Sequence, residues 1–347
     1  MTDFTWLAGE SAAARAKHRL QGKKCGLSPI VGLSPIVFVL LALCALTVVT
    51  AAPAWAQRVY QGIPIVKEGT TIRISPHVYV IPDENARGVP NVGIIVGSRA
   101  TLVVDPGMGL KSGQAVVRET AKVSKGSEIY IVNTHFHPEH TTGEAAFPAS
   151  VKIIRAAAQQ QDIEEMGLKW VQEFSRRSPE LAELLKDIKG FRAPAETFER
   201  EKTLDLGGVP VRLIRLGPAH TRGDTAIFVE GDGVLFSGDL AMKQAFPAFA
   251  TPQSRVDSWI ASLDALNALR PSQVVGAHYG MGDAAIITAY REFFTSLQAR
   301  VAEMKRQGKS SDETATTLRN EFRAKYPDWD QPLRVHSAVT AIYAELP

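Results

Sequence analysis

Short segments rich in apolar residues and bounded by turn-forming residues recur along the chain from about residue 71, and they predict short β-strands. The predicted strands are residues 71–74, 78–81, 91–96, 101–104, 129–132, 151–154, 225–229, 234–236 and 274–275, and residues 204–211 have the signature of a hairpin that 211–216 continues. Apolar residues at helical spacing occupy 112–123, 163–174, 178–188, 254–269 and much of the chain beyond 283. Strands that alternate with helices and hairpins predict mixed sheets with helices outside.

Serines mark the starts of three predicted helices. Ser178 stands directly before a proline, which favours the first turn of a helix. Ser254 stands three residues before an aspartate, and Ser310 stands three residues before a glutamate. Each of these two serines is therefore predicted to cap its helix within a capping box.

The first 56 residues have a different pattern. Basic residues end at Lys24, and no charged residue follows until Arg58. The gap holds the apolar run 36–49 and closes on Ala-Trp-Ala at 54–56, which is the order of a secretory signal peptide with cleavage after Ala56. The run is short for a membrane span, which needs about 20 apolar residues. We therefore expect a periplasmic or secreted protein; the alternative is an uncleaved N-terminal membrane anchor.

Composition narrows the class of protein. A chain of 347 residues, 45% hydrophobic and 22% charged, is long enough for a sizeable core. The net charge of +3 comes from residues 1–56, and the basic and acidic residues of the remainder balance, so no nucleic-acid partner is expected. Both cysteines, Cys25 and Cys44, precede the predicted cleavage site. The mature chain would hold no disulfide and no thiolate metal ligand.

Three histidines and a carboxylate stand within six residues, directly after the apolar run 129–132. His135 and His137 are two residues apart, so at a strand end they point the same way. The chain then turns at a proline and presents Glu139 and His140 from a second direction. Imidazoles and a carboxylate that converge in this way predict a transition-metal site.

Three further polar residues follow β-branched apolar runs. They are His220 after 211–216, Asp239 after 234–236 and His278 after 274–275. Either histidine alone would be typical of a structural histidine. With the cluster at 135–140, however, four strand ends each offer a metal ligand, and five of the eight histidines belong to this set.

With these motifs the chain resembles the metallo-β-lactamase superfamily of dinuclear zinc hydrolases. The resemblance runs from about residue 71 to about residue 280 and follows the order of the family's motifs, from Asp105-Pro-Gly to the Gly-x-His turn at His278. It implies an α+β fold, a four-layer αββα sandwich, with a C-terminal helical extension. We expect residues 57–285 to form the metallo-β-lactamase-like domain and 286–347 to form the extension, packed on the same domain.

The resemblance also implies a ligand set for two zinc ions. The first ion would take His135, His137 and His220; the second would take Glu139, His140 and His278; and Asp239 would bridge the two. The family usually has aspartate at the position of Glu139. Either a small backbone adjustment accommodates the longer side chain, or the second metal is displaced, weaker or absent. Iron is the alternative metal, because the same ligands accept it.

The activity implied by the resemblance is hydrolysis of a small molecule by a metal-bridging hydroxide that attacks a carbonyl, with Glu139 and Asp239 as catalytic residues. A β-lactam, a lactone or a thioester would fit. The alternatives are a non-catalytic periplasmic metal-binding or accessory protein and an iron-dependent oxidoreductase. Arg222 and Lys243 are candidates for substrate contact. A membrane would be a partner only through an uncleaved leader.

Overall fold

The computed structural model describes residues 63–126, 128–249 and 251–346. These described residues belong to one compact unit. The predicted signal peptide and its cleavage site after Ala56 lie outside the described residues. Within the described part of the chain, no helix has the length and apolar character that crossing a membrane requires.

Two sheets form the centre of this unit. The first has seven strands in sequence order, β1 (Ile72–Arg73), β2 (Val78–Ile81), β3 (Val92–Val96), β4 (Ala100–Val104), β5 (Glu128–Val132), β6 (Lys152–Ala156) and β7 (Glu196–Phe198). Pairing is antiparallel from β1 to β4 and parallel from β4 to β7. The second runs in the order β12 (Gln273–Gly276), β11 (Val234–Gly238), β10 (Thr225–Val229), β9 (Pro210–Arg215) and β8 (Glu201–Asp205). Only β12 and β11 are parallel there.

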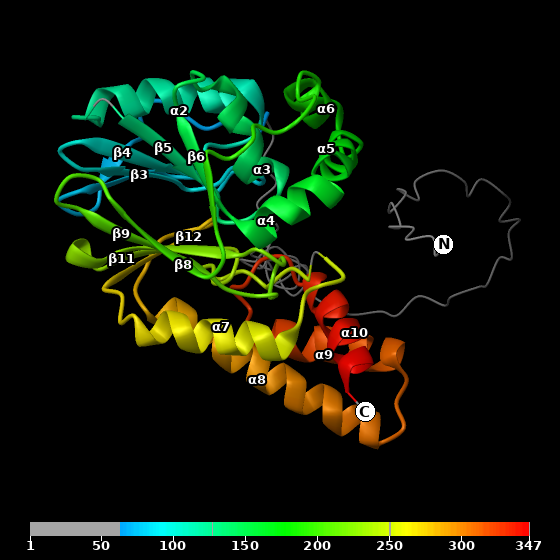
Figure 1. Cartoon of the computed structure of the whole chain (residues 1–347). Helices are drawn as coiled ribbons and strands as arrows, with labels where there is room; N and C mark the ends of the chain where they lie inside the picture. Colours follow the sequence, from blue (N-terminus) through cyan, green and yellow to red (C-terminus); the bar gives the residue numbers. More distant parts are fainter. Residues whose placement is uncertain (1–62, 127, 250, 347) are drawn as a thin grey trace, which may run out of the picture. The chain divides into compact units, whose positions relative to one another are not determined.

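Helices cover the outer face of each sheet (Figure 1). The first sheet carries α2 (Gly109–Val123) and the short elements α3 (Pro138–Thr141), η1 (Thr142–Ala146), α4 (Ala157–Asp162), η2 (Ile163–Gly167), α5 (Leu168–Ser175) and α6 (Pro179–Leu185). The second sheet carries α7 (Val256–Ala268), α8 (Ala285–Arg306), α9 (Ser311–Lys325) and α10 (Arg334–Glu345), and the turn η3 (Glu230–Asp232) joins β10 to β11.

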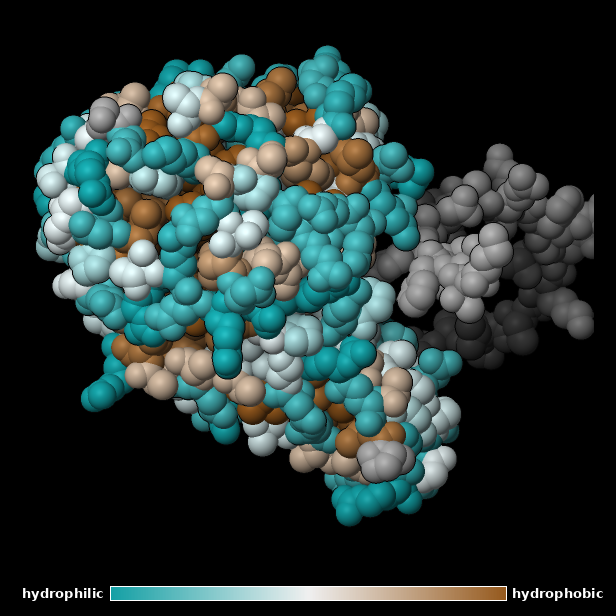
Figure 2. Space-filling model, viewed as in Figure 1, coloured by the Kyte–Doolittle hydropathy of each residue, from teal (hydrophilic) through white to brown (hydrophobic). Residues whose placement is uncertain are grey.

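Three apolar cores separate these layers. One joins α2 to the first sheet, another lies between the two sheets, and the third joins the second sheet to α7, α8, α9 and α10. In the middle core, Val104 and Val132 of the first sheet share a cluster with Phe236 and Val275 of the second. This order of helix, sheet, sheet and helix confirms the predicted αββα sandwich and α+β class. Hydrophilic residues cover most of the visible surface, with hydrophobic residues in scattered patches (Figure 2).

The starts of α7 and α9 differ in how they are capped. Ser310 caps α9 within a complete capping box with Glu313, as predicted. The box predicted at Ser254 is wrong, because the N-cap of α7 is Arg255 and no side chain caps it. The hydroxyl of Ser254 instead donates to the carbonyl oxygen of His220 at 3.0 Å. Tertiary contact with the loop that carries a predicted metal ligand thus takes the place of the local cap.

Candidate metal centre

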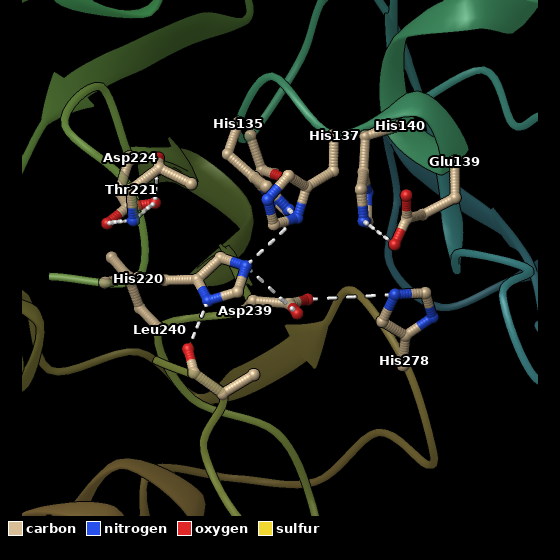
Figure 3. A network of polar contacts seen from close by, with 12 residues as sticks. His135, His137, Glu139, His140, His220, Thr221, Asp224, Asp239, Leu240 and His278 are labelled. Carbon is tan, nitrogen blue, oxygen red and sulfur yellow. Dashed lines mark hydrogen bonds and ion pairs between the residues drawn. The ribbon is translucent and has the colours of Figure 1, made fainter. Parts of the chain in front are cut away.

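The predicted ligands meet at one end of the two sheets (Figure 3). The first sheet contributes the loop after β5, with His135, His137, Glu139 and His140, and the second contributes His220 after β9, Asp239 after β11 and His278 after β12. Proline at position 138 lies in the first turn of α3, where its missing N–H has no intrahelical partner to lose. The turn presents the two halves of the loop from different directions, as the spacing predicted.

Three imidazoles form the innermost group. The Nδ1 atom of His137 lies 3.0 Å from the Nε2 of His135 and 3.3 Å from the Nε2 of His220. All three residues are almost fully buried. Two ligands of a tetrahedral ion held at about 2.0–2.1 Å would lie about 3.3 Å apart, so this spacing fits a metal ion such as zinc.

A second group shares the same space. Ligand atoms of Glu139, His140 and His278 lie within 4.8 Å of one another, as do those of His135, His140 and Asp239. One carboxylate oxygen of Asp239 lies 3.5 Å from the Nε2 of His220, and the other lies 3.8 Å from the Nε2 of His278. Asp239 therefore faces both groups.

In four of the five imidazoles, a hydrogen bond to the ring nitrogen that faces away from the centre fixes the orientation of the ring. The Nδ1 atom of His220 donates to the carbonyl of Ala248 at 2.7 Å, and that of His278 donates to the carbonyl of Val89 at 2.8 Å. The Nδ1 of His140 lies 3.0 Å from Asp105, and that of His135 lies 3.1 Å from the hydroxyl of Thr134. Because Nδ1 holds the proton in this arrangement, each Nε2 is left as an acceptor that can bind a metal.

His137 is held differently from the other histidines. It turns Nδ1 toward the centre, while its buried Nε2 has no hydrogen-bond partner among the described residues. Its ring instead stacks on the indole of Trp170 in α5, with centroids 4.3 Å apart and planes 27° apart. Trp170 lies in the segment 163–174 that was predicted to be helical, and the structure adds that its side chain positions a predicted ligand.

Asp105 connects the end of β4 to the loop after β5 that carries four predicted ligands, residues 133–143, which is called the metal loop below. Its carboxylate accepts from the backbone N–H and the hydroxyl of Thr134, both at 2.7 Å, and from His140. Its backbone lies in the left-handed region with φ 54°, which places the carboxylate beside the loop. Burial raises the pKa of Asp105 to about 7, and the two bonds from Thr134 oppose this rise.

Close backbone contacts at two glycines hold the metal loop against α2. A Cβ atom at Gly113 of α2 would lie 2.1 Å from the carbonyl oxygen of Gly143, and one at Gly143 would lie 2.2 Å from that of Pro106. No side chain fits at either position. The loop after β4, the loop after β5 and α2 are therefore held at fixed separations.

The charge states match the chemistry of a cation site. Burial lowers the pKa of His135, His137 and His140 well below its ordinary value, so these imidazoles are neutral and ready to coordinate. Burial raises the pKa of Glu139 to about 7, although His278 opposes this. For Asp239 burial also favours the neutral form, but the surrounding imidazoles outweigh it and hold its pKa below the usual range.

The centre is reached from the side of the second group. The side chains of Glu139 and His278 are 12% and 14% exposed, whereas His140 between them is fully buried. One carboxylate oxygen of Glu139 is buried without a hydrogen-bond partner among the described residues. A ligand would therefore meet Glu139 and His278 before it met the three inner histidines.

The two predicted substrate contacts lie elsewhere. The guanidinium of Arg222 is held by Asp162 at 3.2 Å and by Glu165 at 2.7 Å, both in the helical layer on the first sheet. Lys243 is exposed and donates to the carbonyl of Met281 at 3.4 Å. The structure thus brings all seven predicted metal ligands together, but neither Arg222 nor Lys243 points to them.

Comparison with known proteins assigns the family. A family model described as the metallo-beta-lactamase superfamily matches residues 86–278. This span covers more than half of the chain and includes every predicted ligand. The chain belongs to the metallo-beta-lactamase superfamily.

Solved structures share the fold at low sequence identity. A metallo-beta-lactamase from Pontibacter korlensis is 17% identical with a TM-score of 0.50, and covers 65% of this chain and 98% of its own. A metallo-beta-lactamase family protein from Thermus thermophilus is 18% identical with a TM-score of 0.54, over 79% and 93% of the two chains. The sec-alkylsulfatase Pisa1 from Pseudomonas sp. is 16% identical with a TM-score of 0.60, over 79% and 50%.

One curated relative has a stated substrate class. A linear primary-alkylsulfatase from Pseudomonas sp. is 23% identical over 218 residues, which is 53% of this chain and 40% of the alkylsulfatase. This chain therefore matches less than half of that protein. The relatives named here are alkylsulfatases and metallo-beta-lactamases, and the cluster of histidines and carboxylates in this chain could hold divalent metal ions.

Proposed function

We propose that this chain is a dinuclear zinc hydrolase of small molecules. The observation that carries the proposal is the convergence of seven donors in two groups that share Asp239. His135, His137 and His220 would hold one ion, and Glu139, His140 and His278 would hold the other. Divalent ions bound there would lower the pKa of a water molecule and polarise the bond to be broken.

The protein's own residues supply orientation and proton handling. Asp239, which faces both groups of donors, would keep them in register. Glu139 stands at the accessible side, and one of its carboxylate oxygens has no hydrogen-bond partner among the described residues, so it is placed to hold a proton for a leaving group. The outer hydrogen bonds on the imidazoles preorganise the site before any ligand arrives. Iron remains the alternative metal for the same donors.

The favoured substrates contain a hydrolysable carbonyl, as in a β-lactam, a lactone or a thioester. A sulfate ester is the second candidate, and the similarity to an alkylsulfatase favours it. We also propose that the chain is exported and cleaved after Ala56, because residues 1–56 have the order of a signal peptide. N-terminal sequencing of the periplasmic protein tests this. Cleavage after Ala56 would leave Gln57 as the first residue, and an earlier first residue would contradict it.

The test of the hydrolase is metal analysis together with turnover of nitrocefin, a lactone, a thioester and p-nitrophenyl sulfate by the purified mature chain. We expect two metal ions per chain and turnover of at least one substrate, lost in His137→Ala. His77→Gln is the matched control, since His77 is bonded to Asp232 outside the centre. A fully loaded chain that turns over none of these substrates would instead support the non-catalytic metal-binding alternative.

A further inference from the structure

Three arginines near the metal centre form no ion pair within residues 63–126, 128–249 and 251–346. They are Arg87 in the loop between β2 and β3, Arg177 in the turn after α5, and Arg334 in the first turn of α10. In Figure 1, α5 in the upper layer and α10 in the lower layer lie on the same side of the molecule. The three side chains are far apart in sequence, so only the fold assembles them.

Arg177 reaches the centre along a row of aromatic rings. Its guanidinium lies 3.7 Å from the ring centroid of Phe174, which neighbours Trp170, and Trp170 stacks on His137. Arg177 is exposed, yet partial desolvation of its guanidinium lowers its pKa; Glu139 raises this pKa, and Arg87 and Arg334 lower it further. The guanidinium is therefore within electrostatic reach of a predicted ligand and of both other arginines.

Arg87 and Arg334 are brought together by the segment before α10. The guanidinium of Arg87 donates to the side-chain oxygen of Gln331 at 3.3 Å, and the backbone N–H of Arg334 donates to the carbonyl of the same residue at 2.9 Å. The neighbouring Asp330 accepts from the hydroxyl of Tyr279, the residue after His278, at 3.0 Å. The guanidinium of Arg334 itself donates to the carbonyl of Phe246 at 3.1 Å. The segment that carries Gln331 and Arg334 thus lies next to the residue that follows His278.

Other arginines of this surface are neutralised by carboxylates. Arg176, adjacent to Arg177 in sequence, pairs with Glu173 at 2.7 Å, and Arg222 pairs with Asp162 and Glu165. Guanidinium groups that repel one another gain most from an anion that they can share. Ions bound at the centre would add more positive charge than Glu139 and Asp239 remove, which increases the field that an anion meets.

We propose that the substrate of the proposed hydrolase carries an anionic group, a carboxylate or a sulfate, that Arg177 binds together with Arg87 and Arg334 beside Glu139. A planar guanidinium presents paired donors to either group. The anion would be held at the accessible side of the centre, and the bond to be broken would face the metal ligands. This inference rests on the proposed function for its place in a reaction, but anion binding itself can be measured without turnover.

The kinetic test compares Arg177→Gln with Arg176→Gln. For p-nitrophenyl sulfate and for nitrocefin, which carries a carboxylate, we expect the KM of Arg177→Gln to rise at least about tenfold, a loss of about 1.4 kcal/mol. The KM for neutral p-nitrophenyl acetate should stay within about twofold, and Arg176→Gln should match the wild type throughout. An effect on the sulfate alone or on nitrocefin alone identifies the anion. Equal effects on charged and neutral substrates would overturn the inference.

Calorimetry with inorganic sulfate and with acetate, on the metal-loaded wild type and both variants, provides the second measurement. We expect at least one anion to bind the wild type and Arg176→Gln, and to bind Arg177→Gln at least about tenfold more weakly. Binding of neither anion to the wild type, or equal binding to all three proteins, contradicts the role of Arg177. Loss of all turnover with this binding pattern intact would overturn the proposed function but leave the anion site standing.

Discussion

The Nε2 atom of His220 lies 3.3 Å from the Nδ1 atom of His137, although the two residues lie in loops that follow strands of different sheets. The Nδ1–H of His220 is already donated to the carbonyl of Ala248. Its Nε2 is therefore an acceptor that points at another ring nitrogen. Ring nitrogens placed in this way fit a shared metal ion, and that ion would link the two halves of the sandwich.

Metal binding should stabilise the fold. An ion that binds only the folded chain adds about 4 kcal/mol to the free energy of unfolding when its concentration is about 1,000 times Kd. Zinc should thus raise the Tm of the chelator-treated wild type and of His77→Gln, and should raise that of His137→Ala far less. Differential scanning calorimetry with and without zinc measures this; an equal rise in His137→Ala would contradict the proposed coordination.

Asp105→Asn should weaken metal binding. Asparagine tolerates the left-handed backbone at this position, but it removes the charge that orients His140 and half of the acceptors offered to Thr134. Loss of such an outer contact typically costs 10–100-fold in metal affinity, and we expect a loss in that range. Competition with a chromogenic chelator measures it. Asp232→Asn, which removes the carboxylate that holds His77, should leave metal affinity unchanged.

Trp170→Ala should also weaken metal binding by the three inner histidines, because the indole ring stacks against His137. We expect a loss of about tenfold in metal affinity, in the range of other contacts that orient ligands. Trp170→Phe keeps an aromatic face and should retain most of the affinity. The same chelator competition measures both variants, and equal losses in the two would show that stacking is not the cause.

Glu139→Gln should change how stability depends on pH when metal is absent. Burial raises the folded-state pKa of Glu139 to about 7 from the model-compound value 4.5, so the folded chain holds the proton more tightly than the unfolded chain. The free energy of unfolding therefore falls as pH rises between these values, and glutamine abolishes this contribution. Urea denaturation in chelator should show the variant gaining more than about 1 kcal/mol on the wild type from pH 5 to pH 8. A constant gap would contradict the burial of a carboxyl with this pKa.

Gly113→Ala should destabilise the chain although alanine favours helices. The propensity gain is about 1 kcal/mol, but the added Cβ would lie 2.1 Å from the carbonyl of Gly143. We expect a net loss of about 1–3 kcal/mol in urea denaturation, as for other overpacked contacts. Gly190→Ala is the control, because no atom lies within 4 Å of its added Cβ. If Gly113→Ala were more stable than the wild type, the metal loop would have to be able to move away from the added methyl group.

The sequence predicted best the strands that are buried, because a buried strand needs a run of apolar residues. Strands such as β2, β3 and β10 are apolar runs, and the five histidines at strand ends stand out because histidine is scarce. β7 escaped prediction because only Phe198 of its three residues is buried, so it lacks an apolar run. The arginines around the centre could not be predicted either. The pairing of Arg87 with Gln331 spans 244 residues and depends wholly on the docked helices.

Because the ligands are divided between the two sheets, the full set of donors exists only when both sheets have assembled. Residues before β6 supply four donors, and the last of the other three, His278, comes 138 residues after His140. A chain cut short before that point, or one whose sheets have not yet met, has only a fragment of the coordination sphere. Loading of both groups is thus expected only where the two sheets have come together, and the number of ions per chain would report the fraction of a preparation that is fully assembled.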